Sequence, residues 1–418
     1  MKRGLLLLTA ILTGFTAQAQ VVNASISMGS GYANQVYYKL PTQANNEYPH
    51  ASWDVAFLRT SAFAFGTRIN DARNIEVYDA SSNIADWATI DVTQIANWTR
   101  LYNSETQWDL GAFDQGSATY GWGEYNPGNH HVTGAVVFVL KYANGTFRKF
   151  KIDDFFGGYT FTYATWDGSA WGADQQVVLP NATNPTNRFN YYSLENATAV
   201  VAEPATTDWD ITFTKYKTDY FGDGSFWQDV TGVFHAPNVQ VAENIEPAGM
   251  PDPLLGGGLT YVEDINQIGY DWKTFNQATF TYSIATDKAF YVKLPNNTVY
   301  RLAFNSFAGS STGNITFNHQ DVTSLLATET FGNNNAFGVY PNPTVDKKIN
   351  IVYDLATAGA QNTVSVYSIT GAKVFEQTLE SATGFFNQSI DLGQLNNGVY
   401  VLKFQSGDYT ATRKIVLQ

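Results

Sequence analysis

The sequence predicts an all-β fold, in which two tandem copies of one antiparallel β domain precede a small β-sandwich. Three observations support this prediction. Aromatic residues make up 15% of the chain and charged residues only 15%, a composition that favours strands and turns over helices. Apolar and polar residues alternate in short segments, as they do in half-buried strands. One five-residue strand pattern occurs twice, at Trp53–Phe57 and at Trp209–Phe213.

The duplication extends well beyond this pattern. The offset between copies is 156 residues for Trp53 and Trp209, and 152 residues for Phe138 and Phe290. Similar offsets at separated places indicate one fold encoded twice. The other matching pairs of segments are Val36–Leu40 with Asn190–Leu194, Phe138–Lys141 with Phe290–Lys293, and Tyr159–Phe161 with Ile315–Phe317.

Residues 1–19 are predicted to be a secretory signal peptide. Lys2 and Arg3 precede a short apolar run, and Ala17-Gln18-Ala19 has the small-x-small pattern of a cleavage site. Cleavage there leaves Gln20 as the first residue. No later segment is apolar for long enough to suggest a transmembrane helix.

The body is predicted to contain domain 1 at residues 20–180 and domain 2 at residues 181–325, with a joint rich in turn-forming residues at 181–190. In domain 1, Asn144-Gly145 is a strong hairpin turn between two apolar strands. In domain 2, Asn296-Asn297 occupies the comparable turn. Residues 326–338 are the predicted linker to the last domain.

Residues 339–418 differ from the body because their charges balance, with six basic and six acidic residues. Short β-forming runs alternate with glycine turns over the whole segment. It resembles the C-terminal sorting domain of the Bacteroidetes type IX secretion system. The residues that carry this resemblance are Tyr340-Pro341-Asn342-Pro343, Gly371 and Lys373, Gly398-Val399-Tyr400, and Lys414-Ile415-Val416-Leu417. The resemblance implies binding to the type IX machinery, export across the outer membrane, and then release or attachment to the cell surface.

Each copy in the body resembles the HmuY-like haem-binding family. The second copy carries the resemblance at Trp209–Phe213 and at several places between Phe290 and Phe317, and the first copy is parallel but looser. The resemblance implies an all-β, right-hand-like fold and haem or porphyrin as the cofactor. In that family a pair of His or Met side chains on finger-like loops binds the iron.

The candidate haem ligands are His235 and Met250 in domain 2, and His130 and His131 in domain 1. His and Met are usual axial donors for haem iron. Each residue also has a structural interpretation: His235 as a solvated loop residue, Met250 as packing beneath its loop, and His130-His131 as part of a polar turn. Phe226, Trp227 and Phe234 are predicted either to flank a porphyrin or to belong to the core.

Other functional classes receive less support from the sequence. The net charge of −13 argues against a nucleic-acid-binding surface. No serine-nucleophile elbow, zinc-protease motif or phosphate-binding loop is present, so we expect no enzymatic activity. The leading hypothesis is an exported haem-binding protein. The alternative is an adhesion or glycan-binding β-protein without haem. A third hypothesis is that the first copy is only a structural spacer and the second copy binds the ligand.

Overall fold

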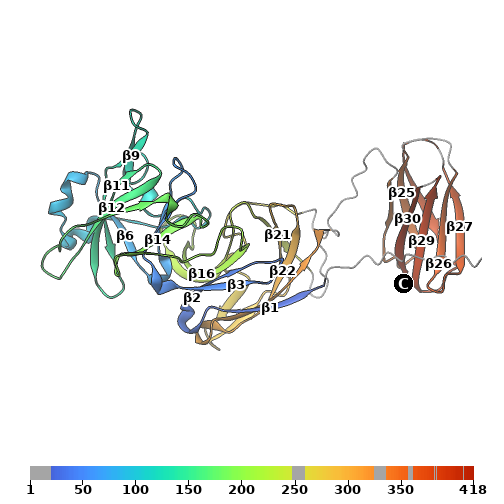
Figure 1. The fold of residues 1–418 in the computed structure, drawn as a ribbon. Helices are drawn as coiled ribbons and strands as arrows, with labels where there is room; N and C mark the ends of the chain where they lie inside the picture. The colour runs from blue at the N-terminus through green and yellow to red at the C-terminus, as the bar shows by residue number, and fades with distance from the viewer. Residues whose placement is uncertain are drawn as a thin grey trace, which may run out of the picture. The chain divides into compact units, whose positions relative to one another are not determined.

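A computed structural model describes residues 20–246, 259–323, 336–355, 361–380, 382, 384–407 and 409–418. The chain divides into two compact units, Met1–Ser324 and Leu325–Gln418. Below, the body is the described part of the first unit, and the C-terminal unit is the described part of the second. Antiparallel strands dominate both, with short 3₁₀ segments between some of them, so the all-β prediction is confirmed (Figure 1).

The first large sheet is formed by strands within residues 76–180. The tight turn between its strands β10 (Val137–Lys141) and β11 (Phe147–Phe155) has Gly145 at φ 85°, a backbone conformation that the predicted Asn-Gly turn supplies. A hairpin of β8 (Gly123–Asn126) and β9 (His131–Gly134) attaches to this sheet through β9 and β11. The strand order is β13 (Gln175–Pro180), β12 (Gly158–Thr165), β11 (Phe147–Phe155), β10 (Val137–Lys141), β6 (Glu76–Ser81) and β7 (Thr99–Leu101).

The second large sheet combines the start of the body with its end. The turn between its strands β21 (Lys288–Lys293) and β22 (Val299–Phe307) has Asn297 at φ 65°, as the comparable turn pattern predicts. A separate hairpin consists of β19 (Lys273–Asn276) and β20 (Thr281–Ile284). The strand order is β1 (Val22–Ser27), β23 (Asn314–Asp321), β22 (Val299–Phe307), β21 (Lys288–Lys293) and β18 (Gln240–Ile245).

The two large sheets share one topology. Strands β13, β12, β11, β10 and β6 correspond in order to β1, β23, β22, β21 and β18. Both sheets also have an irregularity at the same place. The β11–β12 register shifts between Ile152 and Asp154, and the β22–β23 register shifts between Phe304 and Ser306. A shared bulge at equivalent positions supports the duplication predicted from the sequence.

Two small sheets join the copies by exchanging strands. One has the order β15 (Thr198–Val200), β14 (Phe189–Ser193), β4 (Val55–Leu58) and β5 (Thr67–Ile69). The other has the order β17 (Trp227–His235), β16 (Ile211–Asp219), β2 (Asn34–Tyr38) and β3 (Asn45–Pro49). Each sheet therefore pairs a strand from the first half of the body with one from the second. In Figure 1 the small sheets lie between the two large ones.

This pairing corrects the domain boundary predicted at residue 181. Strands β14 and β15 follow that boundary but complete the sheet of β4 and β5. Strands β1 and β2 lie far before it but pair with β23 and β16 respectively, and β3 pairs with β2. The first lobe consequently runs from β4 to β15, and the second lobe contains β1 to β3 with β16 to β23. Strand pairing is a long-range property, which the order of segments along the chain does not reveal.

The repeated Trp-Asp pattern lies at the two places where a strand from one half of the body pairs with a strand from the other half. We call these places the joints. The Asp54 carboxylate accepts a hydrogen bond from the Leu194 N–H at 2.6 Å, and the Asp210 carboxylate accepts one from the Leu40 N–H at 2.9 Å. In both joints the tryptophan meets a tyrosine of the exchanged strand edge-on at 4.9 Å. These pairs are Trp53 with Tyr191 and Trp209 with Tyr37. Each lobe therefore holds a strand that the other half of the sequence supplies.

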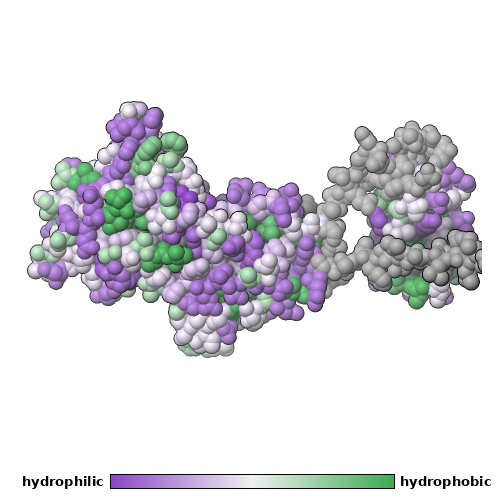
Figure 2. Space-filling view, viewed as in Figure 1, coloured by the Kyte–Doolittle hydropathy of each residue, from purple (hydrophilic) through white to green (hydrophobic). Residues whose placement is uncertain are grey.

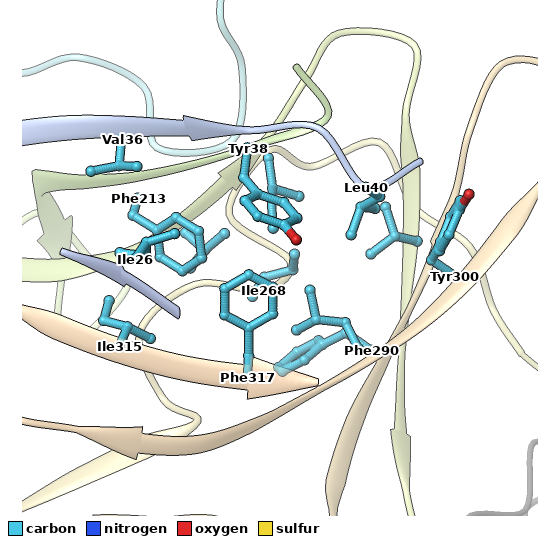
Figure 3. Close-up of a cluster of buried hydrophobic side chains, with 14 of the residues drawn as sticks. Ile26, Val36, Tyr38, Leu40, Phe213, Ile268, Phe290, Tyr300, Ile315 and Phe317 are labelled. Atoms are coloured by element: carbon cyan, nitrogen blue, oxygen red, sulfur yellow. The ribbon is translucent and has the colours of Figure 1, made fainter. Parts of the chain in front are cut away.

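Each lobe has its own apolar core. In the second lobe, Ile26 of β1 and Tyr38 of β2 lie among side chains from the end of the body, including Phe213 and Phe317 (Figure 3). The Tyr38 ring meets the Phe317 ring edge-on at 5.1 Å. At the equivalent place in the first lobe, the Tyr192 ring meets the Phe161 ring edge-on at 5.2 Å. Such aromatic pairs stabilise a core beyond their burial alone.

The C-terminal unit is a small β-sandwich. One core contains side chains from both of its sheets, and the Phe337 and Phe404 rings stack across it at 4.6 Å. The predicted glycine turn has Gly371 at φ 85°. One sheet has the order β24 (Ala336–Tyr340), β25 (Lys348–Leu355) and β28 (Gly384–Asp391), and the other has the order β27 (Lys373–Leu379), β26 (Asn362–Ser368), β29 (Gly398–Ser406) and β30 (Tyr409–Leu417).

The strand exchange predicts which fragment of the body folds. A fragment of residues 53–204 retains every strand of the first lobe, whereas residues 20–180 lack β14 and β15, leave β1 without β23, and leave the β2–β3 pair without β16. We expect urea to unfold the first fragment in one cooperative transition and the second without one. Circular dichroism measures both. A cooperative transition for residues 20–180 alone would contradict the exchange.

The buried carboxylate of Asp54 predicts a large effect of its neutralisation. This side chain is fully buried and also pairs with Arg73 at 2.6 Å. Asn cannot form this ion pair, although Arg73 keeps Glu195 as a second partner at 2.8 Å, so we expect Asp54→Asn to lower the free energy of unfolding by about 2 kcal/mol. Asp208→Asn, at an exposed position, is the control and should change it by less than about 0.5 kcal/mol. Urea denaturation distinguishes the two, and equal effects would refute the role of Asp54.

Candidate functional site

Exposed aromatic side chains of the body gather at the ends of its hairpins. Monomeric proteins usually bury such side chains, so their clustering at loop ends marks candidate binding surfaces. On the face drawn in Figure 2, apolar side chains form separate patches among polar ones. The exposed phenylalanines and tyrosines of the body are Phe63, Tyr120, Tyr125, Phe156, Tyr220, Phe221, Phe226, Phe275 and Phe280.

Two of these hairpins, which we call the fingers, are copies of each other. The first finger is β8–β9 and the second is β19–β20. Trp122 and Trp272 precede their turns, 150 residues apart, and each tryptophan carbonyl accepts a hydrogen bond from an alanine N–H. The turn residues His130 and Phe280, also 150 residues apart, both have positive φ. The two fingers therefore share one backbone design with different side chains.

The second finger borders a large groove of the body. The opposite wall is the β16–β17 hairpin, and Tyr32, which follows β1, completes the lining. The groove has a volume of about 690 Å³, within the range of about 300–1,000 Å³ common for small-molecule sites. Its lining residues are Tyr32, Lys215, Tyr220, Gln228, Asp229, Val230, Thr231, Tyr270, Asp271, Lys273, Thr274, Phe275, Gln277 and Tyr282.

Aromatic packing anchors the second finger. The Trp272 indole is buried and stacks on Phe304 at 3.8 Å, and its Nε1–H donates to the Gly269 carbonyl. Phe307 meets Tyr282 edge-on at 4.7 Å and stacks with Tyr32 at 5.9 Å. The groove is therefore built on a packed aromatic base, which suits a pre-formed binding site.

Lys273 lies on this base. Its ammonium is 4.3 Å from the centre of the Trp272 ring and donates hydrogen bonds to the carbonyls of Thr231 and Tyr270. Burial lowers the pKa of Lys273 to about 7, although the nearby Asp271 carboxylate opposes this shift. The groove consequently contains an amine that changes its charge near neutral pH.

The two acidic side chains of the groove have partners outside its lining. Asp229 pairs with Lys217 at 2.5 Å, and Asp271 pairs with Lys288 at 2.7 Å. Lys215 and Lys273, by contrast, form no ion pair with a carboxylate in the described residues and donate only to backbone carbonyls. Two amines without a paired carboxylate therefore line the groove, in a chain whose net charge is −13.

The predicted haem ligand His235 is buried rather than solvated. Its Nδ1 lies 3.0 Å from the Ala236 carbonyl oxygen and its Nε2 lies 2.9 Å from the Asp264 carbonyl oxygen. Burial lowers its pKa below the ordinary value, while these carbonyls oppose the shift. Binding of iron at either nitrogen would require the loss of one of these contacts. The interpretation of His235 as a solvated loop residue is wrong, because β17 carries it into the interior.

The first finger carries the predicted ligands His130 and His131. His130 is exposed at the turn, and its Nδ1 lies 2.7 Å from the Tyr125 hydroxyl. His131 is partly buried, with Nδ1 2.8 Å from the Asp154 carboxylate and its ring stacked on Phe156 at 4.9 Å. The structure brings these two histidines together but places His235 on a different sheet. Met250 lies outside the described residues.

The aromatic residues predicted to flank a porphyrin have different surroundings. Phe234 is buried and meets the Trp108 ring edge-on at 5.6 Å. Trp227 stacks on Tyr102 at 4.1 Å, which joins the two lobes. Phe226 is half exposed at the end of the β16–β17 hairpin. Two of the three residues therefore serve packing, which was one of their two interpretations from the sequence.

The described residues contain no group of three or more His, Asp or Glu side chains placed to hold a metal ion. Within the same residues, no helix combines the length and the apolar character needed to cross a bilayer.

Sequence reasoning missed the groove residues Tyr270, Lys273 and Tyr282. One signal was available, because the finger pattern around Trp122 recurs around Trp272 at a constant offset of 150 residues. That pattern would identify a repeated hairpin. It would not reveal the opposite wall, which comes from a segment about 50 residues earlier along the chain.

Comparisons with known proteins identify the C-terminal unit. Residues 338–418 match the family model described as the secretion system C-terminal sorting domain. No curated protein matches the chain. One similar solved structure is a biofilm associated protein, BSP domain, with 10% identity and a TM-score of 0.16, covering 99% of this chain and 84% of that chain. A TM-score this low carries no structural argument.

The C-terminal resemblance is thus confirmed. The chain carries a type IX sorting domain, is exported by that system, and is secreted or attached to the cell surface. The reported matches do not support the HmuY-like resemblance of the body, which stays a prediction.

The lowered pKa of Lys273 predicts a pH-dependent contribution to stability. An ordinary lysine has a pKa of about 10.4, so the folded protein binds this proton more weakly than the unfolded chain. The contribution of Lys273 to folding stability therefore falls as the pH falls from about 10 to about 7. We expect Lys273→Met to gain most relative to the wild type at pH 7 and least at pH 10.

Urea denaturation from pH 7 to pH 10 measures this difference. Lys141→Met is the control, because Lys141 is partly exposed and pairs with Glu76 at 3.0 Å on the first large sheet. A difference between the Lys273 variant and the wild type that does not change with pH would contradict the prediction.

Proposed function

Because the chain ends in a type IX sorting domain and is exported by that system, we propose that its body is a non-enzymatic binding protein that holds a saccharide outside the cell. One observation carries the proposal: the groove between the second finger and the β16–β17 hairpin alternates aromatic rings with hydrogen-bonding groups. This proposal corresponds to the glycan-binding alternative of the sequence analysis.

The chemistry of a sugar matches this lining. One face of a pyranose ring presents C–H groups, which pack against an aromatic ring, while its edge presents hydroxyls that both donate and accept hydrogen bonds. Tyr220 and Tyr270 supply ring surface, and Gln228, Thr274 and Gln277 supply polar groups. A purely apolar ligand would leave these polar groups without partners, at a cost in binding free energy.

Haem is the competing ligand proposed from the sequence. No His or Met is among the lining residues of the groove, and His235 already has a carbonyl oxygen near each ring nitrogen. His130 and His131 on the first finger are the remaining described candidates for haem ligands. The saccharide proposal is favoured because the aromatic and polar side chains that a sugar would need already line one open groove.

A matched pair of variants tests the saccharide proposal. Tyr220 and Phe221 are neighbours on one hairpin and are 55% and 66% exposed, but only Tyr220 lines the groove. We expect an immobilised glycan panel to retain the purified protein. Loss of one stacking contact is worth about 1.4 kcal/mol, so Tyr220→Ala should weaken binding of the retained glycan about tenfold. Phe221→Ala keeps the Tyr220 ring and removes only its edge-on neighbour at 5.0 Å, so it should weaken that binding by much less than tenfold.

Titration with haemin provides the competing readout. A Soret shift that disappears in a His130→Ala, His131→Ala variant, with no glycan retained, would replace the saccharide proposal by haem binding. Equal effects of Tyr220→Ala and Phe221→Ala would exclude the groove as the glycan site.

A further inference from the structure

We infer that the groove selects a carboxylated saccharide, such as one that contains uronic acid, and that Lys273 and Lys215 receive its carboxylate. The inference rests on the proposed saccharide-binding function and specifies its ligand class.

The charge balance of the groove is the first argument. Its two acids, Asp229 and Asp271, each pair with a lysine that is not part of the lining, and the lysine beside Asp271 also pairs with Glu243. Its two lysines have no carboxylate partner among the described residues. A neutral ligand would leave this positive charge uncompensated, whereas a carboxylate would pair with it in a partly desolvated site, where the attraction is stronger than in water.

The hydrogen bonds of Lys273 are the second argument. An ammonium group has three donors, and two of them point to the carbonyls of Thr231 and Tyr270. One N–H remains for a ligand. The same ammonium lies near the Trp272 and Phe307 rings, 4.3 Å and 5.0 Å from their centres. A carboxylate bound there would be held beside the aromatic surface on which a sugar ring packs.

The inference has a thermodynamic consequence. The groups that line the groove with Lys273 and can titrate or carry charge are Lys215, Asp229, Asp271 and the tyrosines Tyr32, Tyr220, Tyr270 and Tyr282. Burial holds the pKa of free Lys273 at about 7. A bound carboxylate stabilises the charged amine and raises its pKa, so binding at pH 7.5 takes up a fraction of a proton. Affinity should fall as the pH rises above 7.

Isothermal titration calorimetry of the full chain tests the inference. The probes are tetragalacturonate and a hyaluronan tetrasaccharide, each compared with its methyl ester, which has the same skeleton but no charge. We expect the acid of at least one pair to bind tenfold or more tightly than its ester. Titrations in buffers of different ionisation enthalpy at pH 7.5 should reveal net proton uptake.

Three variants separate charge from folding. Lys273→Met retains the apolar stem and should abolish both the preference for the acid and the proton uptake. Lys215→Gln should reduce the preference with uptake retained, and Lys141→Gln on the first large sheet is the matched control. Circular dichroism verifies that each variant is folded. If Lys273→Met unfolds, the loss of acid preference in Lys215→Gln still tests whether the groove selects a carboxylate.

The outcomes distinguish the inference from the proposal on which it rests. Equal binding of acids and esters, or an acid preference that survives Lys273→Met and Lys215→Gln, overturns the selection of a carboxylate while saccharide binding stands. Retention of only uncharged glycans on the panel also overturns it. Failure of every saccharide to bind overturns the proposed function itself.

Discussion

The body depends on two buried carboxylates that each hold a strand from the other half of the sequence. Asp54 accepts the Leu194 N–H, and Asp210 accepts the Leu40 N–H. Because charged groups are costly to bury, such a carboxylate is stable only when its donors are in place. The Trp-Asp pattern is therefore a structural joint that requires both copies. It explains why the body is one compact unit although its sequence is duplicated.

The exchange also assembles the groove. Tyr32 lies between β1 and β2, whereas the two hairpin walls come from residues 215–231 and 270–282. Pairing of β1 with β23 and of β2 with β16 brings the start of the body beside these walls. The binding surface consequently belongs to the second lobe as a folded unit. No continuous stretch of sequence contains it.

Duplication provided two fingers, and their side chains have diverged. Both begin after a buried tryptophan and share the same strand register. Gly123 occupies the first finger where Lys273 occupies the second, 150 residues later. The first finger has no side chain at the position that supplies positive charge to the groove. Its histidines, exposed His130 and partly buried His131, give it a different polar character. The two fingers therefore share a backbone design but differ in the ligand chemistry that their side chains can provide.

The sequence by itself determined the local structure and the destination of this protein. Alternating residues and turns such as Asn144-Gly145 specify strands and hairpins through short-range preferences, and the motifs of residues 339–418 identify the sorting domain. Only the tertiary structure decided which strands pair, that His235 is buried between carbonyls, and that Lys273 faces a groove. These features depend on contacts between residues far apart in the chain, and burial and pKa are set by the neighbours that such contacts bring.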